Sequence, residues 1–452
     1  MYRTRPANID LFRLHEHNPD RYPFLLESVA SGTAQSQFDI LFAFPRETSR
    51  LTSDGQLHGY CMDGSHDFLS SFDYWFNNET RQSVEDTRLP FHGGWFVYLA
   101  YEMAGEIEKS LVLPGNDDVC TMAYAVRCPA AVILDHVKSE IYVFAENEHT
   151  GLIADMEKDI QSVECTRPAL SEPIKIDYLD EEDASIYRNS VDRIKKYIVD
   201  GDVFQVNLSR LWKGGIEKGF SARNLYRKLR LNNPAPFSSF AALPDFTIIS
   251  SSPERLVSVK HNRIETRPIA GTRPRSENIE EDERLSSELM AHPKEQAEHI
   301  MLIDLERNDL GRVCKPGSID VDELMALESY THVHHIVSNI SGELCEGTSP
   351  ADIIRAVFPG GTITGCPKVR CMQIIAELEE QPRGAYTGSL GYVNLDGSMD
   401  LNILIRTLVV DDNGLSIRAG AGIVYDSDPQ SELAETRAKA RGLLMALSLK
   451  ES

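Results

Sequence analysis

The segment Val203–Trp212 (VFQVNLSRLW) constrains the fold of this chain more than any other, because its residues alternate as in a strand with two unlike faces. One face carries Phe204, Val206 and Leu208, and the other carries Gln205, Asn207 and Ser209. A helix is predicted directly before this strand, since Asp183 can cap it and Gly201 can end it. The apolar stripe of that helix consists of Tyr187, Val191, Ile194 and Ile198.

Other predicted strands follow one another without regular helices between them. Near the N-terminus, Gly93–Met103 reads as a strand, and Ala130–His136 forms a hairpin with Glu140–Glu146. In the second half, strands are mostly separated by turns. The sequence therefore predicts an α+β fold with large antiparallel sheets rather than a doubly wound parallel sheet.

The chain divides into two regions by its chemical content. Residues 1–165 are β-rich with few chemical signals, whereas residues 183–452 carry the motifs described below. Between them, Cys165–Glu182 contains two prolines and a run of acids, which predicts a linker or a surface crossover. There is no fixed-period repeat and no low-complexity segment.

Composition excludes several classes of partner. A net charge of -23 over 452 residues argues against nucleic acid, because phosphate binding needs a basic face. An anionic substrate would need a local group of cations or backbone N–H donors to reverse that field. The apolar runs are too short to span a bilayer, and the eight cysteines form no CxxC pair, so we expect a cytoplasmic protein with reduced thiols.

Two acidic pairs are candidate metal ligands. Pro293–His299 (PKEQAEH) and Pro429–Glu435 (PQSELAE) each begin a helix and carry two glutamates three residues apart, on one helix face. Such pairs are often solvated surface that favours the helix dipole. If the two helices converge, their oxygens suit magnesium rather than zinc. The four acids are Glu295, Glu298, Glu432 and Glu435.

Glycine-rich and basic segments offer candidate sites for an anion. Pro359–Lys368 (PGGTITGCPK) resembles a phosphate loop but lacks its GxxxxGK[ST] spacing. In Arg418–Gly422 (RAGAG), backbone N–H groups could approach a carboxylate closely, although a tight strand bend explains the glycines equally well. Arg406, within the predicted strand Leu401–Leu408, needs an acidic partner or an anionic ligand.

Together these segments resemble the chorismate-utilising family, which includes anthranilate, aminodeoxychorismate, isochorismate and salicylate synthases. The match is dense from about Asp183 to the C-terminus. It implies an α+β sandwich of antiparallel sheets with helices packed outside. It also implies that Glu298 and Glu435 hold Mg²⁺ with the ring carboxylate of the substrate, supported by Glu295 and Glu432.

The resemblance implies further site residues. Glu254 matches the general acid for the leaving hydroxyl, a task that suits a carboxyl whose pKa is raised by burial. His335 matches the active-site histidine, and Gln205, Ala270 and Thr272 complete the catalytic set. The implied substrate-binding residues are Thr362, Thr364, Lys368, Tyr386, Arg406, Gly420, Ala421 and Gly422.

Gln205 narrows the choice of reaction. It stands where water-adding family members carry a lysine base, which disfavours isochorismate and salicylate synthases. Four stretches resemble aminodeoxychorismate synthases rather than anthranilate synthases. They are QVNLS (Gln205–Ser209), NPAPFSSF (Asn233–Phe240), SPERL (Ser252–Leu256) and PGGTITG (Pro359–Gly365).

One motif favours anthranilate synthase, which stays open as the alternative. Pro268–Thr272 (PIAGT) has Ala270 where many aminodeoxychorismate synthases have a nucleophilic lysine. Because alanine has no nucleophilic atom, we hypothesise that ammonia takes the place of the lysine and forms a noncovalent 2-amino intermediate. The expected product is 4-amino-4-deoxychorismate, for 4-aminobenzoate and folate biosynthesis.

Ammonia requires a partner. The chain has no Gly-x-Cys-x-Gly nucleophile, and the nearest match, Gly59–Asp63, fails at its last position. A separate glutamine amidotransferase subunit, and hence a heterodimer, is implied by the resemblance. A non-catalytic partner of an amidotransferase is the remaining alternative, and it requires the acidic pairs to be inert surface.

A second ligand is suggested near the N-terminus. Phe24–Ser28 (FLLES) resembles the LLES element that binds tryptophan in anthranilate synthases. Leu26, Glu27 and Ser28 are therefore candidates for a tryptophan pocket. An amphipathic edge strand explains the same pattern equally well.

Overall fold

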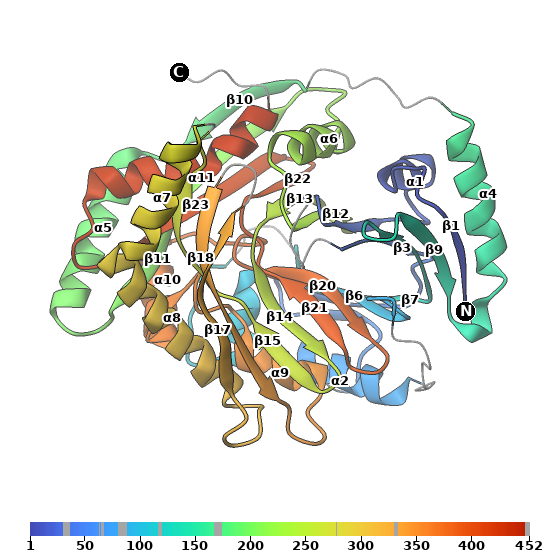
Figure 1. Cartoon of the computed structure of the whole chain (residues 1–452), viewed down its shortest axis with the longest axis horizontal. Helices are drawn as coiled ribbons and strands as arrows, with labels where there is room; N and C mark the ends of the chain where they lie inside the picture. The colour runs from blue at the N-terminus through green and yellow to red at the C-terminus, as the bar shows by residue number, and fades with distance from the viewer. Residues whose placement is uncertain are drawn as a thin grey trace.

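Two large antiparallel sheets form the core of the protein, with helices outside them (Figure 1). The computed structural model describes residues 1–29, 37–62, 64, 67–79, 88–115, 120–166, 174–276, 278–329 and 333–447. Every strand pairing within these ranges is antiparallel. The predicted α+β class is thus confirmed.

The first sheet has 12 strands among the described residues. In spatial order its strands are β1 (Tyr2–Pro6), β9 (Glu140–Ala145), β8 (Ala130–Asp135), β3 (Phe38–Ala43), β2 (Phe24–Glu27), β12 (Phe237–Ala242), β13 (Phe246–Ser252), β22 (Thr407–Asp411), β23 (Gly414–Ile423), β11 (Gln205–Ile216) and β10 (Ile176–Glu181), with β19 (Gly365–Cys366) beside β11.

The second sheet has 11 strands in the same part of the chain. Its strands are β16 (Ile269–Pro274), β18 (Val333–Glu343), β15 (Arg263–Thr266), β14 (Arg255–Lys260), β21 (Met399–Asn402), β20 (Ser389–Asn394), β6 (Gly94–Leu99), β7 (Thr121–Cys128), β4 (Thr48–Thr52) and β5 (Leu57–Gly59), with β17 (Asp320–Ser329) beside β18.

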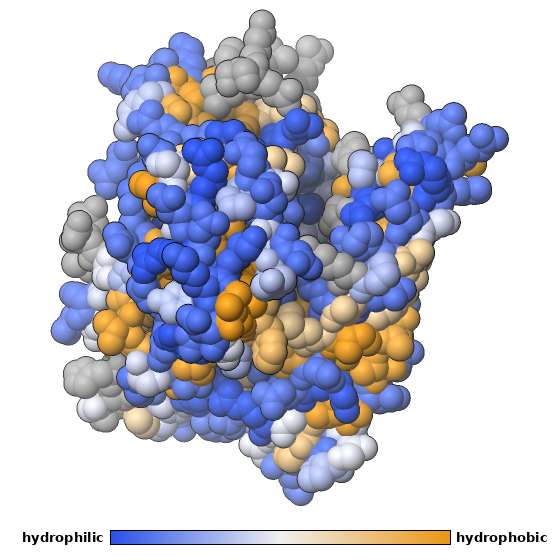
Figure 2. Space-filling view, turned by 90° about the vertical axis from the view of Figure 1, so that its left-hand side faces the viewer, coloured by the Kyte–Doolittle hydropathy of each residue, from blue (hydrophilic) through white to orange (hydrophobic). Residues whose placement is uncertain are grey.

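Helices cover the sheets from outside. They are α1 (Phe12–His17), α2 (Phe68–Asn78), α3 (Ala104–Ile107), α4 (Leu152–Glu164), α5 (Ala184–Val199), α6 (Ala222–Asn232), α7 (Ile279–Ala291), α8 (Pro293–Leu310), α9 (Pro350–Val357), α10 (Lys368–Glu379) and α11 (Pro429–Ala446). Helices α4, α6, α10 and α11 pack on the first sheet, and α2, α7 and α8 pack on the second. The face with α5, α7 and α8, on the left of Figure 1, is mostly hydrophilic with separate hydrophobic groups (Figure 2).

Each of the two sheets contains strands from both regions of the sequence, residues 1–165 and residues 183–452. In the first sheet, β2 of the N-terminal region pairs with β12 of the C-terminal region. In the second sheet, β6 pairs with β20 in the same way. The sites described below therefore depend on pairing between segments that are far apart in the sequence.

Aromatic packing holds the two sheets together. Phe24 of β2 stacks on Phe96 of β6 with ring centroids 4.0 Å apart and an interplanar angle of 2°. Phe42 of β3 contacts Phe96 edge-on at 5.6 Å. All three side chains are buried, so the interface between the sheets removes a large apolar area from water.

Local predictions are confirmed where a short motif determines the element. The hairpin forms as β8 and β9, and the Asp183 side chain accepts a hydrogen bond from Ser185 N at the start of α5. Pro293 and Pro429 begin α8 and α11 as predicted. Gly93–Met103 is a strand only over Gly94–Leu99 and then turns into a 3₁₀ helix.

Two local predictions are wrong in part. Within Cys165–Glu182, residues 167–173 lie outside the described residues, but Ile176–Glu181 is the edge strand β10, because it pairs with β11. The predicted strand Leu401–Leu408 is interrupted, because Arg406 adopts a positive φ of 51° between β21 and β22.

We expect Phe96→Ala to destabilise the protein by about 3–5 kcal/mol, because it removes the stack between the sheets and leaves a cavity. Urea unfolding of the full chain measures this loss. The control is Tyr178→Ala on the edge strand β10, where the side chain is 54% exposed, and it should change stability by only about 0.5 kcal/mol. Equal losses in the two variants would contradict this account of the core.

Candidate active site

The candidate active site is built on the pairing of β11 with β23. In this ladder Asn207 lies opposite Gly422, and Ser209 lies opposite Gly420. Gln205, Asn207 and Ser209 project from one face of β11, as the alternation predicted. The glycines are required by the close packing over them, since a Cβ on Gly422 would lie 2.2 Å from Gln205 Nε2.

A second close approach occurs over Gly420. A Cβ on this residue would lie 2.7 Å from the Tyr386 hydroxyl and 2.8 Å from Asn207 Oδ1. Two polar groups therefore converge on the backbone of β23 at the position predicted to hold a carboxylate. Ala421 projects from the opposite face and packs in the core with Leu208, so only its backbone can contribute to the site.

The first acidic pair lies at the start of α8. Glu298 Oε1 accepts a hydrogen bond of 2.8 Å from Gln205 Nε2. Glu295 Oε1 lies 3.4 Å from Arg273 Nη1. His292 caps the helix by accepting a hydrogen bond from Glu295 N. Glu298, rather than Glu295, therefore contacts the predicted catalytic residue of β11.

The second acidic pair lies at the start of α11, which packs on β23. Glu435 Oε1 pairs with Lys439 Nζ at 2.8 Å, and Lys439 donates a 3.0 Å hydrogen bond to Gly420 O. Glu432 is half-buried and contributes, after burial, to raising the pKa of Tyr187. Helix α11 thus brings one carboxylate and one ammonium toward the same strand as Glu298.

The residues present fit a hard cation in part. In the described part of the chain, no three acidic, histidine or cysteine side chains are placed together to hold a metal ion. Glu298 and Glu435 nevertheless lie near β23: a Cβ on Gly422 would lie 3.6 Å from Glu298 Oε1, and Glu435 pairs with Lys439, which donates to Gly420 O. Because Mg²⁺ keeps several waters and needs only one or two protein carboxylates, this donor set suits it. The magnesium site stays a prediction.

Glu254 is the candidate acid. Its side chain is buried, which raises the pKa of the carboxyl to about 7. Thr362 Oγ1 donates a 2.7 Å hydrogen bond to Glu254 Oε1, and the nearby cations Lys439 and Arg406 also favour the ionised form. A carboxyl with a pKa near neutrality can give and recover a proton at working pH.

Arg406 lies between β21 and β22 in a strained conformation. A positive φ of 51° is costly for a residue with a side chain, and such strain is typical of functional sites. Burial lowers the pKa of the guanidinium, and Glu254 opposes this shift through its charge. The charge of Arg406 is therefore available to an anionic ligand.

His335 lies on β18, opposite Thr272 of β16. Its Nδ1 is 3.2 Å from Gly271 O, which can only accept, so Nδ1 carries the proton and Nε2 carries the lone pair. Burial, together with Arg406, lowers the pKa of the imidazole to about 4, so it is neutral. Ala270 is buried beside the bulge in this ladder, and the side chain of Thr272 lies outside the described residues.

Residues of the glycine-rich loop have different roles. The Thr364 hydroxyl donates to Gly360 O at 2.9 Å and so shapes the loop, whereas Thr362 binds Glu254. Lys368 forms a buried ion pair with Asp309 instead of contacting the residues around Gly420. The contribution of Lys368 to substrate binding stays a prediction.

The structure places some residues in the candidate site that the sequence analysis did not predict. Glu306 is buried near Glu254, and burial together with Asp309 raises its pKa to about 8. Lys439 had a detectable signal, because it follows Glu435 by four residues on one helix face. Glu379 and Arg383 have the same spacing of four residues, but their contacts with the glycine-rich loop and β11 come from separate elements and leave no local pattern.

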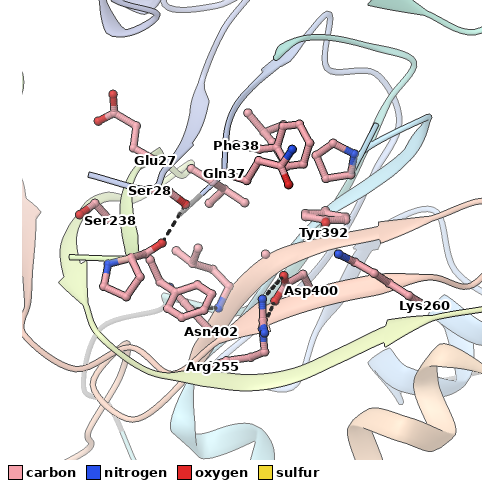
Figure 3. Close-up of a pocket in the computed structure, with 17 residues that line it drawn as sticks. Glu27, Ser28, Gln37, Phe38, Ser238, Arg255, Lys260, Tyr392, Asp400 and Asn402 are labelled. Carbon is pink, nitrogen blue, oxygen red and sulfur yellow. Dashed lines mark hydrogen bonds and ion pairs between the residues drawn. The ribbon is translucent and has the colours of Figure 1, made fainter. Parts of the chain in front are cut away.

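The LLES segment lines a separate cavity of about 120 Å³ between the two sheets (Figure 3). Glu27 belongs to this lining, but its buried side chain points away from the cavity toward α6 (Figure 3), where it accepts a hydrogen bond from Tyr226 and pairs with Arg230 at 2.9 Å. Burial and the nearby Asp39 raise the pKa of Glu27 to about 7. Leu26, Glu27 and Ser28 thus line a pocket, and tryptophan as its ligand stays a prediction. Other lining residues are Gln37, Phe38, Pro236, Phe237, Arg255, Tyr392, Asp400 and Asn402.

Comparison with known proteins identifies the class of protein. The family described as chorismate binding enzymes matches residues 24–445, so the chain belongs to that family. Among solved structures, anthranilate synthase component I from Streptococcus pneumoniae is similar, with a TM-score of 0.79 and 31% identity, covering 91% of this chain and 93% of that one. The predicted fold is thereby confirmed at the level of the family.

Curated relatives carry two names. The aminodeoxychorismate synthase component 1 of Bacillus subtilis is 42% identical over 85% of this chain and 83% of its own length. An anthranilate synthase component I-like protein of Synechocystis is 43% identical over 79% of this chain and 73% of its own length. Similarity alone therefore does not choose between the two reactions. In the described residues, no helix is long and apolar enough to cross a membrane.

We expect Gly420→Ala to raise the Kd for chorismate by about tenfold or more, because the added methyl group would displace the Tyr386 hydroxyl and Asn207. Equilibrium binding by calorimetry, without ammonia, measures this change. The control is Gly151→Ala, where no atom lies within 4 Å of the added Cβ and where affinity should not change. Wild-type affinity in Gly420→Ala would show that chorismate does not bind at this strand.

Proposed function

We propose that this chain is the synthase subunit of an aminodeoxychorismate synthase, which converts chorismate and ammonia to 4-amino-4-deoxychorismate and water. The observation that carries the proposal is Gln205, whose amide donates to Glu298 at the place of the lysine base in water-adding family members. An amide cannot take a proton from water, which supports amination instead of hydration.

The proposal also states that the product retains the enolpyruvyl group, which separates this reaction from that of anthranilate synthase. It is supported by four segments that resemble aminodeoxychorismate synthases, among them QVNLS on β11. The expected role is the supply of 4-aminobenzoate for folate.

The first chemical step is addition of ammonia to ring C2. As the C2–N bond forms, the two ring double bonds shift and the C4–O bond breaks. Glu254 gives its proton to the departing hydroxyl, which leaves as water. Because Ala270 offers no nucleophile, the 2-amino intermediate is held without a covalent bond to the protein.

In the second step, a nitrogen at ring C4 replaces the nitrogen at ring C2. A second ammonia attacks C4, the double bonds shift back, and the C2 nitrogen leaves as ammonia. The new C4 ammonium group returns a proton to Glu254, so atoms and charges balance over the cycle. Glu254 must therefore alternate between its two protonation states, which its pKa of about 7 allows.

Binding groups surround this chemistry. Glu298 and Glu435 would hold Mg²⁺, which supplies positive charge to the ring carboxylate. Tyr386 and the backbone at Gly420 receive the enolpyruvyl carboxylate, and the Arg406 guanidinium adds charge that the acidic chain otherwise lacks. A separate glutamine amidotransferase supplies the ammonia.

Anthranilate synthase is the second candidate, because Ala270 is typical of that enzyme and its relatives match at equal identity. That reaction shares the addition at C2 but then loses the enolpyruvyl group as pyruvate. The two candidates therefore differ in a product that is simple to measure.

We expect the purified chain, mixed with chorismate, Mg²⁺ and excess ammonium salt at mildly alkaline pH, to form a product that retains the enolpyruvyl group. Product mass and a coupled pyruvate assay measure this outcome, and a parallel sample with excess chelator should show no turnover. Pyruvate release in proportion to a fluorescent aromatic product would instead establish anthranilate synthase.

The rate should depend on protonation of Glu254. Because the acid must be protonated at the start of the cycle, we expect kcat to fall as pH rises through about 7, at a constant concentration of free ammonia. Glu254→Gln should lower kcat by a factor of about 10²–10⁴ and remove this limb of the profile. The control Glu265→Gln, on the partly exposed strand β15, should keep both kcat and the limb. An unchanged profile in Glu254→Gln would exclude Glu254 as the acid.

A further inference from the structure

Asn207 is a polar side chain of the site that the mechanism above does not use. It lies on β11 between Gln205 and Ser209 and shares their face. Gln205 donates to Glu298, and Ser209 donates through both its N and its Oγ to Glu379. In contrast, Asn207 Oδ1 is buried and accepts no hydrogen bond from any described residue. A buried polar atom without a partner is unfavourable unless a ligand completes it, and the carboxamide of Asn207 holds such an atom.

The backbone of Asn207 is fixed from two sides. Its N–H donates to Thr364 O at 2.9 Å, which joins β11 to the glycine-rich loop. Its carbonyl accepts a 2.7 Å hydrogen bond from Arg383 Nη2. Arg383 is itself held by Glu379, and both side chains are almost fully buried. The direction in which the Asn207 side chain leaves the strand is therefore set before any ligand binds.

The Asn207 carboxamide and the Tyr386 hydroxyl both lie over Gly420. Asn207 Oδ1 and the Tyr386 hydroxyl lie 2.8 Å and 2.7 Å, respectively, from the point that a Cβ on Gly420 would occupy. Burial raises the pKa of Tyr386 to about 12, so its hydroxyl keeps its proton and can donate. A half-turn of the planar carboxamide exchanges its oxygen for the NH₂ group at no cost in volume. The two side chains then present two neutral donors at one place.

We propose that Asn207 contacts the substrate and donates a hydrogen bond from its NH₂ group to the enolpyruvyl carboxylate, beside the Tyr386 hydroxyl. This inference rests on the proposed function only for its substrate, chorismate. A neutral donor suits this position, because a carboxylate is drawn to donors and repelled by the acids that dominate the chain. The contact falls on the group whose retention separates the two candidate products.

Two substitutions test the contact through equilibrium binding of chorismate to the full chain with Mg²⁺ and without ammonia. Asn207→Val removes the donor at similar size, and we expect the Kd to rise about tenfold. Asn207→Asp places a carboxylate against a carboxylate, so at pH 8 the Kd should rise by about a hundredfold or more. In Asn207→Asp the lost affinity should return as the pH falls and the new side chain takes up a proton, which a purely structural defect would not do.

The matched control is Asn394→Asp. Asn394 is fully buried on β20, and its Oδ1 accepts a hydrogen bond from His92 N, so this variant disturbs a buried amide away from the site. We expect lower thermal stability but an unchanged Kd for chorismate. An equal loss of affinity in Asn394→Asp and Asn207→Asp would overturn the inference, because general destabilisation would then explain both.

A chorismate analogue with a methyl group in place of the enolpyruvyl carboxylate isolates the contact. Wild type and Asn207→Val should bind this analogue with the same Kd, since the proposed acceptor is missing. Wild-type affinity for chorismate in both Asn207 variants, or an equal loss for chorismate and analogue, would overturn the inference. Pyruvate release in the product assay would overturn the proposed function but leave these ratios of Kd unchanged, because both reactions begin with chorismate.

Discussion

The buried ion pair between Arg383 and Glu379 is the interaction on which the rest of the site depends. Arg383 also donates to the carbonyls of Ile363 and Asn207, which lie on the glycine-rich loop and on β11. Glu379 accepts from Ser209 on β11 and from Arg418 on β23. One pair of charges therefore joins four segments of the chain. Burial would raise the pKa of Glu379, but Arg383 outweighs it and holds the pKa below its ordinary value.

Around this charged centre, the reactive groups are shifted toward their neutral forms. Burial raises the pKa of Glu254 and Glu306 and lowers that of His335 and Arg406. The Arg383–Glu379 pair thus keeps both of its charges in the interior, whereas burial dominates the pKa shifts of these neighbouring groups. An anionic substrate would favour the charged form of Arg406 and would further raise the pKa of Glu254, because added negative charge favours a cation and disfavours a carboxylate. The overall negative charge of the chain makes this local arrangement more necessary.

Prediction from sequence was accurate where a residue acts through its own neighbours in the chain. The caps and prolines at the starts of α5, α8 and α11 are local signals, and the alternation of β11 correctly assigned Gln205 to the site face. Prediction failed where the tertiary structure overrides local pattern. Arg406 lies within an apolar run that reads as one strand, yet the chain turns there with a positive φ of 51°, and the guanidinium lies near Glu254.

By itself the sequence determined the class of fold and the family, and it predicted the residues of the candidate site, because these follow from short patterns and residue types. Tertiary structure alone decided which of these residues meet. It brought Glu298 to Gln205 and Thr362 to Glu254, whereas it paired Lys368 with Asp309. It also decided that the side chains of Asn207 and Tyr386 both lie over Gly420. The physical reason is that strand pairing and burial act between residues far apart in the chain, whose mutual approach no local pattern records.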